Sequence, residues 1–471
     1  MSSVTGTAGH PVPRPDFVTA ARAGRAFLGR GGVLGALDAL HQALGDVFQL
    51  PVPGFASVVL VGPEANRFLL TESREQFLWR AEGDPVTRLL RDGVLVTDGA
   101  FHDDLRQVMT PALHRSLFGR FVEVMLRQCD QVTGHWRDGA RVDLLEEMRR
   151  VSLCILTETL FGDDFSGRMD TLWSSILRTI RYISPGPWVI WPGMPRPGYR
   201  RALERVDSYL YELIARRRGE AGARSSDLLS ILLASGMDDE QIKDQLLTMF
   251  IAGHDTSTAL LAWTLYLLAT HDEAMERARA DVETAFGAEA PTLGGMRRLS
   301  YLDRVIKETL RLYPPIHLGS RIAAADVRFQ EYRIPAGTRV VYSIYLTHRD
   351  ARYWAAPDVF DPDRFAPEKA GQRPAYAFVP FGAGPRNCLG AAFAQVEAKV
   401  VLARLLQRFT FRAVGGGARP RMRATLEPSP GAVVEARRLE HAAGAMPWGL
   451  HSDAASRREG ARASDGRAQQ D

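Results

Sequence analysis

One cysteine of the chain stands where it could act as a metal ligand. Residues 381–390 read Phe-Gly-Ala-Gly-Pro-Arg-Asn-Cys-Leu-Gly, and an expected helix at Ala391–Leu406 follows. The unpaired amides and the dipole at a helix N-terminus lower the pKa of a nearby thiol and favour the thiolate of Cys388, which binds metals. Gly390 leaves room beside the sulfur for a flat ligand. The alternative is an ordinary glycine-rich turn around a buried cysteine.

A second group with chemical potential lies inside a long helical pattern at about Asp238–Thr270. Its middle, residues 252–257, contains Gly253, Asp255 and Thr256. Glycine costs about 1 kcal/mol against alanine inside a helix, and a threonine hydroxyl competes for backbone carbonyls, so we expect the helix ladder to open locally. A carboxylate and a hydroxyl beside the opening could deliver protons. The alternative is a glycine at a tight helix crossing and a threonine bonded to its own helix.

Two charged pairs occur at helical spacing. Glu308 and Arg311 are three residues apart, and His102 and Arg106 are four residues apart, so each pair shares one helix face. Pairs of this kind are common on exposed helix surfaces. Their spacing alone therefore leaves both as ordinary surface features, and His102 as a plain surface cation.

Taken in order, these segments resemble the motifs of the cytochrome P-450 family. The pattern Phe-x-x-Gly-x-Arg-x-Cys-x-Gly at 381–390 is complete and resembles the family's haem-binding signature. The resemblance runs from about residue 30 to residue 440 and also covers the three other motifs. It implies a mainly α fold with a minor β region, in which a long central helix lies over the haem and the cysteine loop lies beneath it.

The resemblance also implies roles for individual residues. Cys388 would be the axial ligand of haem b (iron protoporphyrin IX), and its thiolate would favour O–O cleavage. Asp255 and Thr256 would serve catalysis, and Glu308, Arg311 and Arg364 would form a buried network that supports the cysteine loop. The other implied cofactor-binding residues are His102, Arg106, Ala252, Gly253, Arg321, Phe381, Arg386 and Gly390.

The implied activity is that of a monooxygenase. It would insert one atom of O2 into a lipophilic organic substrate, by hydroxylation or epoxidation, with reducing equivalents originally from NAD(P)H. We expect a soluble bacterial type without a fused reductase, which receives electrons from a separate ferredoxin or flavodoxin with its reductase. A peroxide-driven peroxygenase, a non-oxygenating haem-thiolate enzyme and a haem-thiolate gas sensor remain alternatives. The arginines expected to attract the acidic electron donor are Arg115, Arg120, Arg127 and Arg404.

Composition and charge limit the partners and the cellular location that we expect. The 59 lysines and arginines exceed the 55 acidic residues by 4, which is too little to indicate a nucleic-acid partner. Three scattered cysteines argue against a disulfide framework and favour a reducing, cytoplasmic location. The longest uncharged helical stretch, Thr256–Thr270, is shorter than the ~20 residues that span a bilayer. We expect a monomer.

The chain divides into one large domain with two tails. Residues 1–15 and 441–471 are rich in small and polar residues and are expected to be disordered, which leaves a single haem domain at 16–440. Within it, a loop between two helices contains Trp188 and Trp191. We expect this loop to gate a lipophilic substrate and to allow peripheral membrane contact, or else to pack on the core.

Further elements follow from hydrophobic periodicity and from turn and capping signals. Ser300 with Asp303 resembles a capping box at the start of a helix ending near Leu312. The other expected helices are at about Pro63–Leu70, His102–Leu113, Leu117–Trp136, Leu144–Leu160, Ser166–Tyr182, Arg200–Arg218 and Ser225–Ala234. The expected strands are at Val47–Leu50, Ser57–Val61, Arg339–Tyr345 and around Phe409–Phe411 and Val433–Glu435.

Overall fold

The computed structural model describes residues 9–29, 31–50, 52, 57–186, 194, 196–220 and 226–439. The amide of His10 donates to the carbonyl of Glu331 at 2.8 Å, so the described chain begins before the domain boundary expected at residue 16. Within these ranges, no helix combines the length and the apolar character that crossing a bilayer requires. Two sequence predictions fall outside the described residues: the lid tryptophans Trp188 and Trp191, and the tail 441–471.

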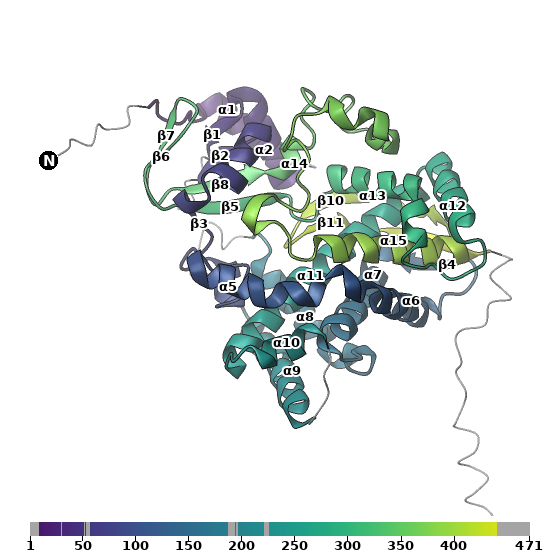
Figure 1. The fold of residues 1–471 in the computed structure, drawn as a ribbon. Helices are drawn as coiled ribbons and strands as arrows, with labels where there is room; N and C mark the ends of the chain where they lie inside the picture. Colours follow the sequence, from purple (N-terminus) through teal and green to yellow (C-terminus); the bar gives the residue numbers. More distant parts are fainter. Residues whose placement is uncertain are drawn as a thin grey trace, which may run out of the picture.

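Helices make up most of the described chain, and the sequence predicted the type of the central ones correctly (Figure 1). The α-helices are α1 Phe17–Leu28, α2 Gly32–Leu44, α3 Pro63–Arg67, α4 Pro85–Leu90, α5 Gly99–Met109, α6 Phe118–Thr133, α7 Leu144–Leu156, α8 Met169–Ile183, α9 Tyr199–Gly219, α10 Leu228–Ala234, α11 Asp239–Ala269, α12 Asp272–Phe286, α13 Ser300–Leu312, α14 Ile344–Thr347 and α15 Ala391–Arg408.

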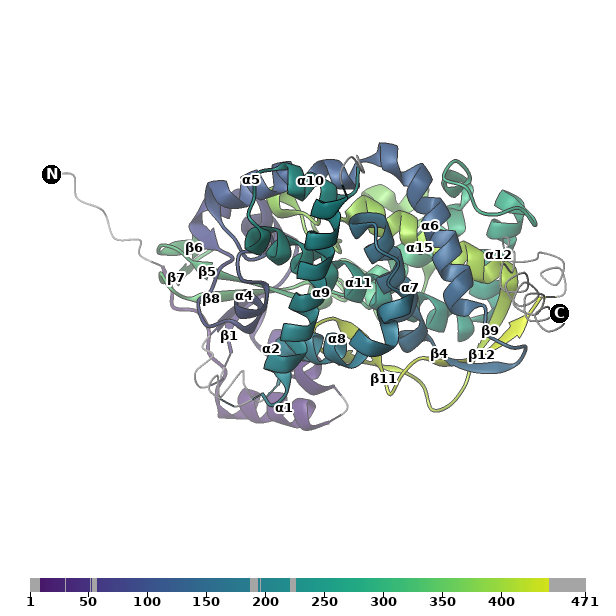
Figure 2. The same ribbon diagram turned by 90° about the horizontal axis from the view of Figure 1, so that it is seen from below.

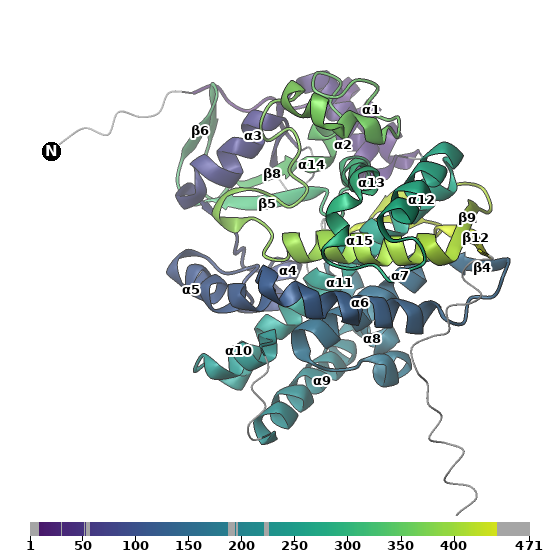
Figure 3. The same ribbon diagram turned by 45° about the vertical axis from the view of Figure 1, so that its right-hand side comes forward.

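Helix α11 is the long central helix that the sequence predicted. A capping box closes its N-terminus. The Asp238 carboxylate accepts from the amide of Gln241 at 2.8 Å, and the side-chain oxygen of Gln241 accepts from the amide of Asp238. Helices α8, α9 and α10 lie on one side of α11, and α13 and α15 lie on the other (Figures 1 and 3). The helix is continuous through residues 252–257, so the expected opening of its hydrogen-bond ladder is not present.

Four small sheets complete the described fold. The largest has the strand order β1-β2-β8-β5-β3, in which β2 and β8 are parallel and β5 pairs with β8 in antiparallel register. The alternation of a strand places Arg321 of β5 on the buried face with Gly319 and Ala323. The strands are β1 Val47–Gln49, β2 Ser57–Leu60, β3 Phe77–Leu78, β4 Ala140–Asp143, β5 Leu318–Ala323, β6 Val327–Phe329, β7 Tyr332–Ile334, β8 Arg339–Ser343, β9 Phe409–Ala413, β10 Arg419–Met422, β11 Leu426–Ser429 and β12 Val433–Arg438.

The expected capping box at the start of α13 is wrong. No side chain of the helix caps its first turn. Instead, the Asp281 carboxylate of α12 accepts from the amides of Tyr301 and Leu302, both at 2.9 Å. Asp303 pairs with Lys307 and Lys399, each at 2.7 Å. An acid from a neighbouring helix has therefore taken the capping role, and Asp303 joins α13 to α15.

Candidate active site

The cysteine loop, residues 381–390, is closed by its own backbone. The amide of Cys388 donates to the carbonyl of Phe381 at 2.8 Å. Gly384 has a φ of +67°, and a β-carbon there would lie 2.2 Å from the carbonyl oxygen of Leu70. Glycine is thus required at this position both by the backbone angle and by the space. Helix α15 begins three residues after the cysteine, as predicted, so the loop delivers the sulfur to the N-terminus of a long helix.

The thiol of Cys388 is reachable, whereas Cys129 and Cys154 are buried. Surrounding protein atoms desolvate it, which raises its pKa, while the amide of Gly390 and the guanidinium of Arg106 act in the opposite direction. The expected lowering of this pKa is therefore not seen, because desolvation dominates. A group that solvent reaches although protein surrounds it lines an interior space. A metal cation at the sulfur would favour the thiolate.

Arginine side chains surround the loop and join it to α5 and its preceding turn. Arg106 of α5 donates to the carbonyl and to the side-chain oxygen of Asn387, at 2.9 and 3.1 Å. Arg386 donates to the carbonyl of Thr97 at 2.7 Å and to the carboxylate of Asp98 at 2.6 Å. The sequence did not identify Asp98, although it is the carboxylate that pairs with Arg386.

Two further basic residues near the loop are buried. The Arg321 guanidinium is stacked 4.0 Å from the ring of Trp79, and no carboxylate of the described residues lies within 4.0 Å of it. His102 is 2% exposed, so it is not a plain surface residue. Desolvation, together with repulsion from Arg321, lowers the pKa of Arg386 to about 10, although Asp98 acts against it. A buried cation without a carboxylate partner, as Arg321 is, fits an anionic ligand.

Helix α11 has an accessible patch halfway along its length. Ala252, Gly253 and Thr256 are part-exposed, while the helix is buried on both sides of them. A β-carbon at Gly253 would lie 2.4 Å from a methyl carbon of Leu156 in α7, and the Thr256 hydroxyl donates to the carbonyl of Ala252 at 2.9 Å. Both features of the alternative explanation are thus present, the glycine at a tight helix crossing and the threonine bonded to its own helix. The helix also has an accessible patch, which indicates an interior space next to it.

Asp255 is buried next to that patch in an ionic network. Arg149 of α7 donates to Asp255 at 3.0 Å and to Glu427 of β11 at 2.6 Å, and the hydroxyl of Thr425 donates to Asp255 at 3.1 Å. One buried guanidinium therefore serves two carboxylates. Desolvation raises the pKa of Glu427. The sequence identified neither Arg149 nor Glu427, because nothing in their local pattern places them beside α11.

A short contact beside this motif joins α11 to α15, the helix that follows the cysteine. The hydroxyl of Ser257 donates to the carboxylate of Glu397 at 2.6 Å, and desolvation raises the pKa of Glu397 to about 7. Ser257 directly follows Thr256, and Glu397 lies nine residues after Cys388. The central helix and the helix that carries the loop are thus packed together close to both motifs.

The structure brings Glu308, Arg311 and Arg364 together in a buried network, as the resemblance implied. Arg311 donates to both oxygens of Glu308 at 2.7 Å, and Arg364 donates to Glu308 at 3.0 Å. Arg311 also donates to the carbonyl of His348 at 2.9 Å, and the ring of His348 accepts from the amide of Val379 at 3.0 Å. The network therefore reaches the segment leading into the cysteine loop through His348, which the sequence did not identify.

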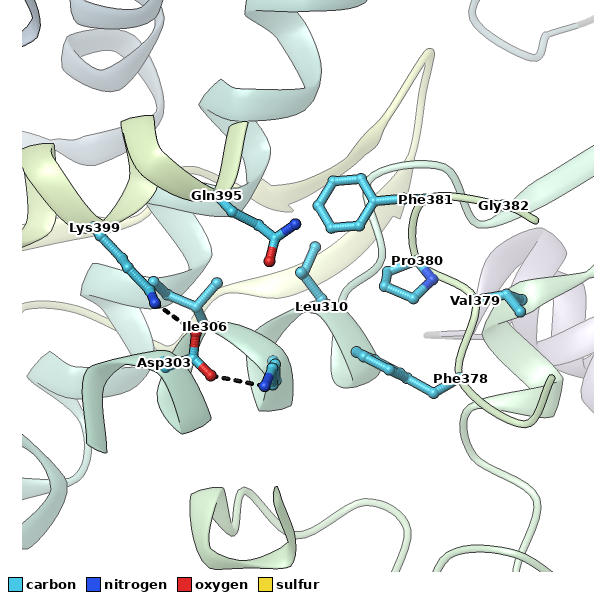
Figure 4. A pocket seen from close by; sticks show the side chains of 11 residues that line it. Asp303, Ile306, Leu310, Phe378, Val379, Pro380, Phe381, Gly382, Gln395 and Lys399 are labelled. Atoms are coloured by element: carbon cyan, nitrogen blue, oxygen red, sulfur yellow. Dashed lines mark ion pairs between the residues drawn. The ribbon is translucent and has the colours of Figure 1, made fainter. Parts of the chain in front are cut away.

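A cavity of about 200 Å³ lies between the cysteine loop, α13 and α15 (Figure 4). Phe381 and Gly382 line it from the loop, and the ion pair of Asp303 with Lys399 forms part of its wall. Cys388 is not among the residues that line this cavity. The cysteine loop thus lies between α13 and α15.

Comparison with known families gives a match over most of the chain. The family described as Cytochrome P-450 matches residues 22–436. A solved structure titled "Retinoic acid bound cyanobacterial CYP120A1" superposes with a TM-score of 0.82 at 26% identity, and the match covers 92% of this chain and 100% of that chain.

Two curated bacterial relatives are similar over nearly the same length. A Mycobacterium tuberculosis protein with the provisional name cytochrome P-450 139 is 32% identical over 424 residues, which are 86% of this chain and 97% of the relative. The cyclooctat-9-en-7-ol 5-monooxygenase of Streptomyces melanosporofaciens is 30% identical over 391 residues, which are 79% of this chain and 84% of the relative.

Proposed function

The chain belongs to the cytochrome P-450 family, and from this premise we propose that its monooxygenase activity is centred on Cys388. Membership of the family provides the fold, the haem cofactor and the use of O2 with reducing equivalents. The observation that supports the assignment of the site is a reachable thiol next to Arg106, in a loop region where Arg321 is a buried cation. This combination fits a flat, anionic, metal-containing ligand.

The residues around the loop fit two parts of iron protoporphyrin IX, the iron and the carboxylates at the edge of the ring. Cys388 would provide the sulfur ligand of the iron. His102, Arg106, Arg321 and Arg386 would bind the two carboxylates at the edge of the ring by charge-assisted hydrogen bonds. When bound, the haem supplies the activation of O2, which a thiolate ligand promotes by pushing electron density towards the iron. The residues proposed to flank the ring are Ala252, Gly253, Phe381 and Gly390.

Replacing Arg321 by methionine is expected to weaken haem retention. The variant removes a buried cation that has no carboxylate partner among the described residues, and a hydrogen bond to a charged group contributes about 1.5–3 kcal/mol. We expect haem loss to apomyoglobin to be at least about tenfold faster than in the wild type. The exposed Arg328 provides the control, and Arg328→Met should retain haem normally. Equal loss rates for Arg321→Met and the wild type would contradict the assignment.

We propose that Asp255 and Thr256 deliver protons for oxygen cleavage. Thr256 lies on the accessible patch of α11, and Asp255 is adjacent to it in the buried network with Arg149. Forming water from one oxygen atom requires two protons, and a carboxylate and a hydroxyl are suited to pass them. Arg149 would hold the Asp255 carboxylate in place between proton transfers.

The variant Asp255→Asn is expected to form product more slowly by about 10²-fold, the lower range for a lost acid–base group. Because asparagine has nearly the same shape, haem content and substrate binding should be unchanged, and consumed O2 should appear as hydrogen peroxide. The measurement is product and peroxide formed per NAD(P)H. Glu427→Gln removes the other carboxylate on Arg149 and is the matched control. An equal loss in both variants would indicate a disturbed ion network instead of lost proton delivery.

We propose a lipophilic substrate and a separate ferredoxin or flavodoxin with an NAD(P)H-dependent reductase, in a cytoplasmic monomer. The names of two similar proteins, which refer to cyclooctat-9-en-7-ol and to retinoic acid, suggest where a substrate screen should begin. Of the arginines expected to attract the electron donor, Arg127 and Arg404 are paired with Glu158 and Asp130. Arg115 and Arg120 are exposed, and they are the better candidates. Membrane contact through Trp188 and Trp191 stays a prediction.

The test of the proposed function is turnover with isotopically labelled O2. The purified haem protein would be combined with a ferredoxin, its reductase, NAD(P)H and a ligand that perturbs the haem spectrum in a screen of fatty acids, terpenoids, carotenoids and macrocycles. We expect one labelled oxygen atom in each product molecule. Product that carries only unlabelled oxygen would contradict the proposal. So would turnover with hydrogen peroxide but none with the ferredoxin system.

A further inference from the structure

Helix α1 exposes an unusual amount of apolar surface. Phe17, Val18, Phe27 and Leu28 are 88%, 65%, 51% and 85% exposed, and they are four of the ten large hydrophobic residues that are exposed among the described residues. The opposite side of the helix is covered, because Ala23 is buried in a cluster with Leu37 and Leu40 of α2. Figures 1 and 2 both show α1 at the edge of the molecule beside α2. The helix is thus held by α2 and leaves one face uncovered.

Most of the apolar residues of α1 that reach solvent lie on one side of the helix, and Val18 lies next to them on the side of Arg22 and Arg25. Phe17, Ala21, Gly24 and Leu28 follow the i, i+4, i+7, i+11 spacing of a single side of a helix, and Phe27 extends that side. No Asp or Glu lies within the twelve residues of α1. The helix therefore points an apolar side towards solvent.

Unpaired positive charge lies beside this face. Arg22 and Arg25 of α1 are exposed, and across the described ranges neither side chain has an ion-pair or hydrogen-bond partner. An apolar helix face flanked by arginines is the pattern of helices that lie in the surface of an anionic membrane.

The size of the face argues against a second protein chain as its occupant. Twelve helical residues span about 18 Å, so a face about 10 Å wide offers roughly 200 Å². A stable protein–protein interface buries roughly 800 Å² on each partner. A lipid surface needs no such area, because apolar side chains enter the headgroup region individually while arginines contact the phosphates.

We propose that α1 docks the protein on anionic lipid surfaces, with Phe17, Val18, Phe27 and Leu28 in the headgroup region and Arg22 and Arg25 on lipid phosphates. The docking is peripheral and reversible. It depends neither on the ligand of the haem nor on the lid tryptophans. It would place the enzyme where lipophilic molecules concentrate.

The test is co-sedimentation of the haem-loaded full-length protein with vesicles. One set contains phosphatidylcholine alone, and the other contains phosphatidylcholine mixed with phosphatidylglycerol. We expect binding to the mixed vesicles that weakens with salt. The double variant Phe17→Ser/Leu28→Ser should bind at least about tenfold more weakly, and Arg22→Gln/Arg25→Gln should lose about fivefold for each arginine.

The control is Tyr211→Ser/Val359→Ser, which removes two exposed apolar side chains far from α1 in sequence and should bind vesicles like the wild type. An unchanged haem absorption spectrum confirms that each variant is folded. The proposal is overturned by equal binding to neutral and anionic vesicles, or by an equal loss in the control. It is also overturned if the α1 substitutions abolish a concentration-dependent dimer without affecting vesicle binding. The arginine variant keeps the test decisive if the serine variant fails to fold.

Discussion

Cys388→Ser protein is expected to lose oxygen insertion almost completely, because the alkoxide or hydroxyl of serine cannot replace the electron donation of a thiolate. Disturbing a residue that merely supports a metal ligand costs about 10- to 100-fold, and loss of the ligand itself should exceed this. The loop conformation should persist, since its closing bond runs from the amide of Cys388 to the carbonyl of Phe381 and does not involve the side chain. The measurement is product formed per haem with the ferredoxin system.

The two other cysteines provide matched controls for this experiment. Cys129 and Cys154 are buried, and desolvation raises the pKa of each thiol to about 12, so neither is suited to bind a metal. Cys129→Ala and Cys154→Ala should retain product formation per haem. Retained activity in Cys388→Ser, or a comparable loss in either control, would refute the assignment of Cys388.

Glu308→Ala is expected to destabilise the folded protein strongly. Glu308 and Arg311 are completely buried, and Glu308 is the carboxylate to which both Arg311 and Arg364 donate. Its removal leaves two buried guanidinium groups without their counter-charge, a change that costs roughly 3–5 kcal/mol. Because Arg311 also contacts the backbone of His348, the loss should extend to the segment before the cysteine loop. The measurement is the free energy of unfolding in urea, with haem content recorded for each variant.

An exposed pair on the neighbouring helix provides the comparison. Glu273 and Arg277 of α12 also share a helix face, but Glu273 is largely exposed. Surface pairs of this kind contribute about 0–1 kcal/mol. Glu273→Ala should therefore unfold nearly as the wild type does. If Glu308→Ala cost no more than Glu273→Ala, the supporting role of the buried network would be wrong.

The parts of the fold that could be predicted are those with strong local signals. A long helical pattern at about Asp238–Thr270 predicted α11 to within one residue at each end. The cysteine loop was also predictable, since Gly384 is required by backbone angle and by space, and such requirements leave a readable pattern. The contacts of Glu308 with Arg311 and Arg364 could be anticipated only because a family resemblance supplied the third residue.

The parts that could not be predicted depend on residues far apart in the sequence. Arg149 lies 106 positions from Asp255 and 278 from Glu427, and its own helix pattern does not show that it is buried. The start of α13 at Ser300 was predicted correctly, but its cap was mispredicted for the same reason, because the Asp281 carboxylate of another helix caps it. The pKa of Cys388 was misjudged because desolvation is a property of the packed protein and not of the helix terminus alone.

The most direct test of the central claim is the absorption spectrum of the reduced protein with carbon monoxide. If Cys388 binds the iron as a thiolate, the wild type should show the Soret band displaced to long wavelength that thiolate ligation produces. Cys388→His should retain haem but lose this displacement, because a neutral imidazole donates less charge. A wild-type spectrum without the displaced band, or a spectrum that Cys388→His leaves unchanged, would contradict the assignment.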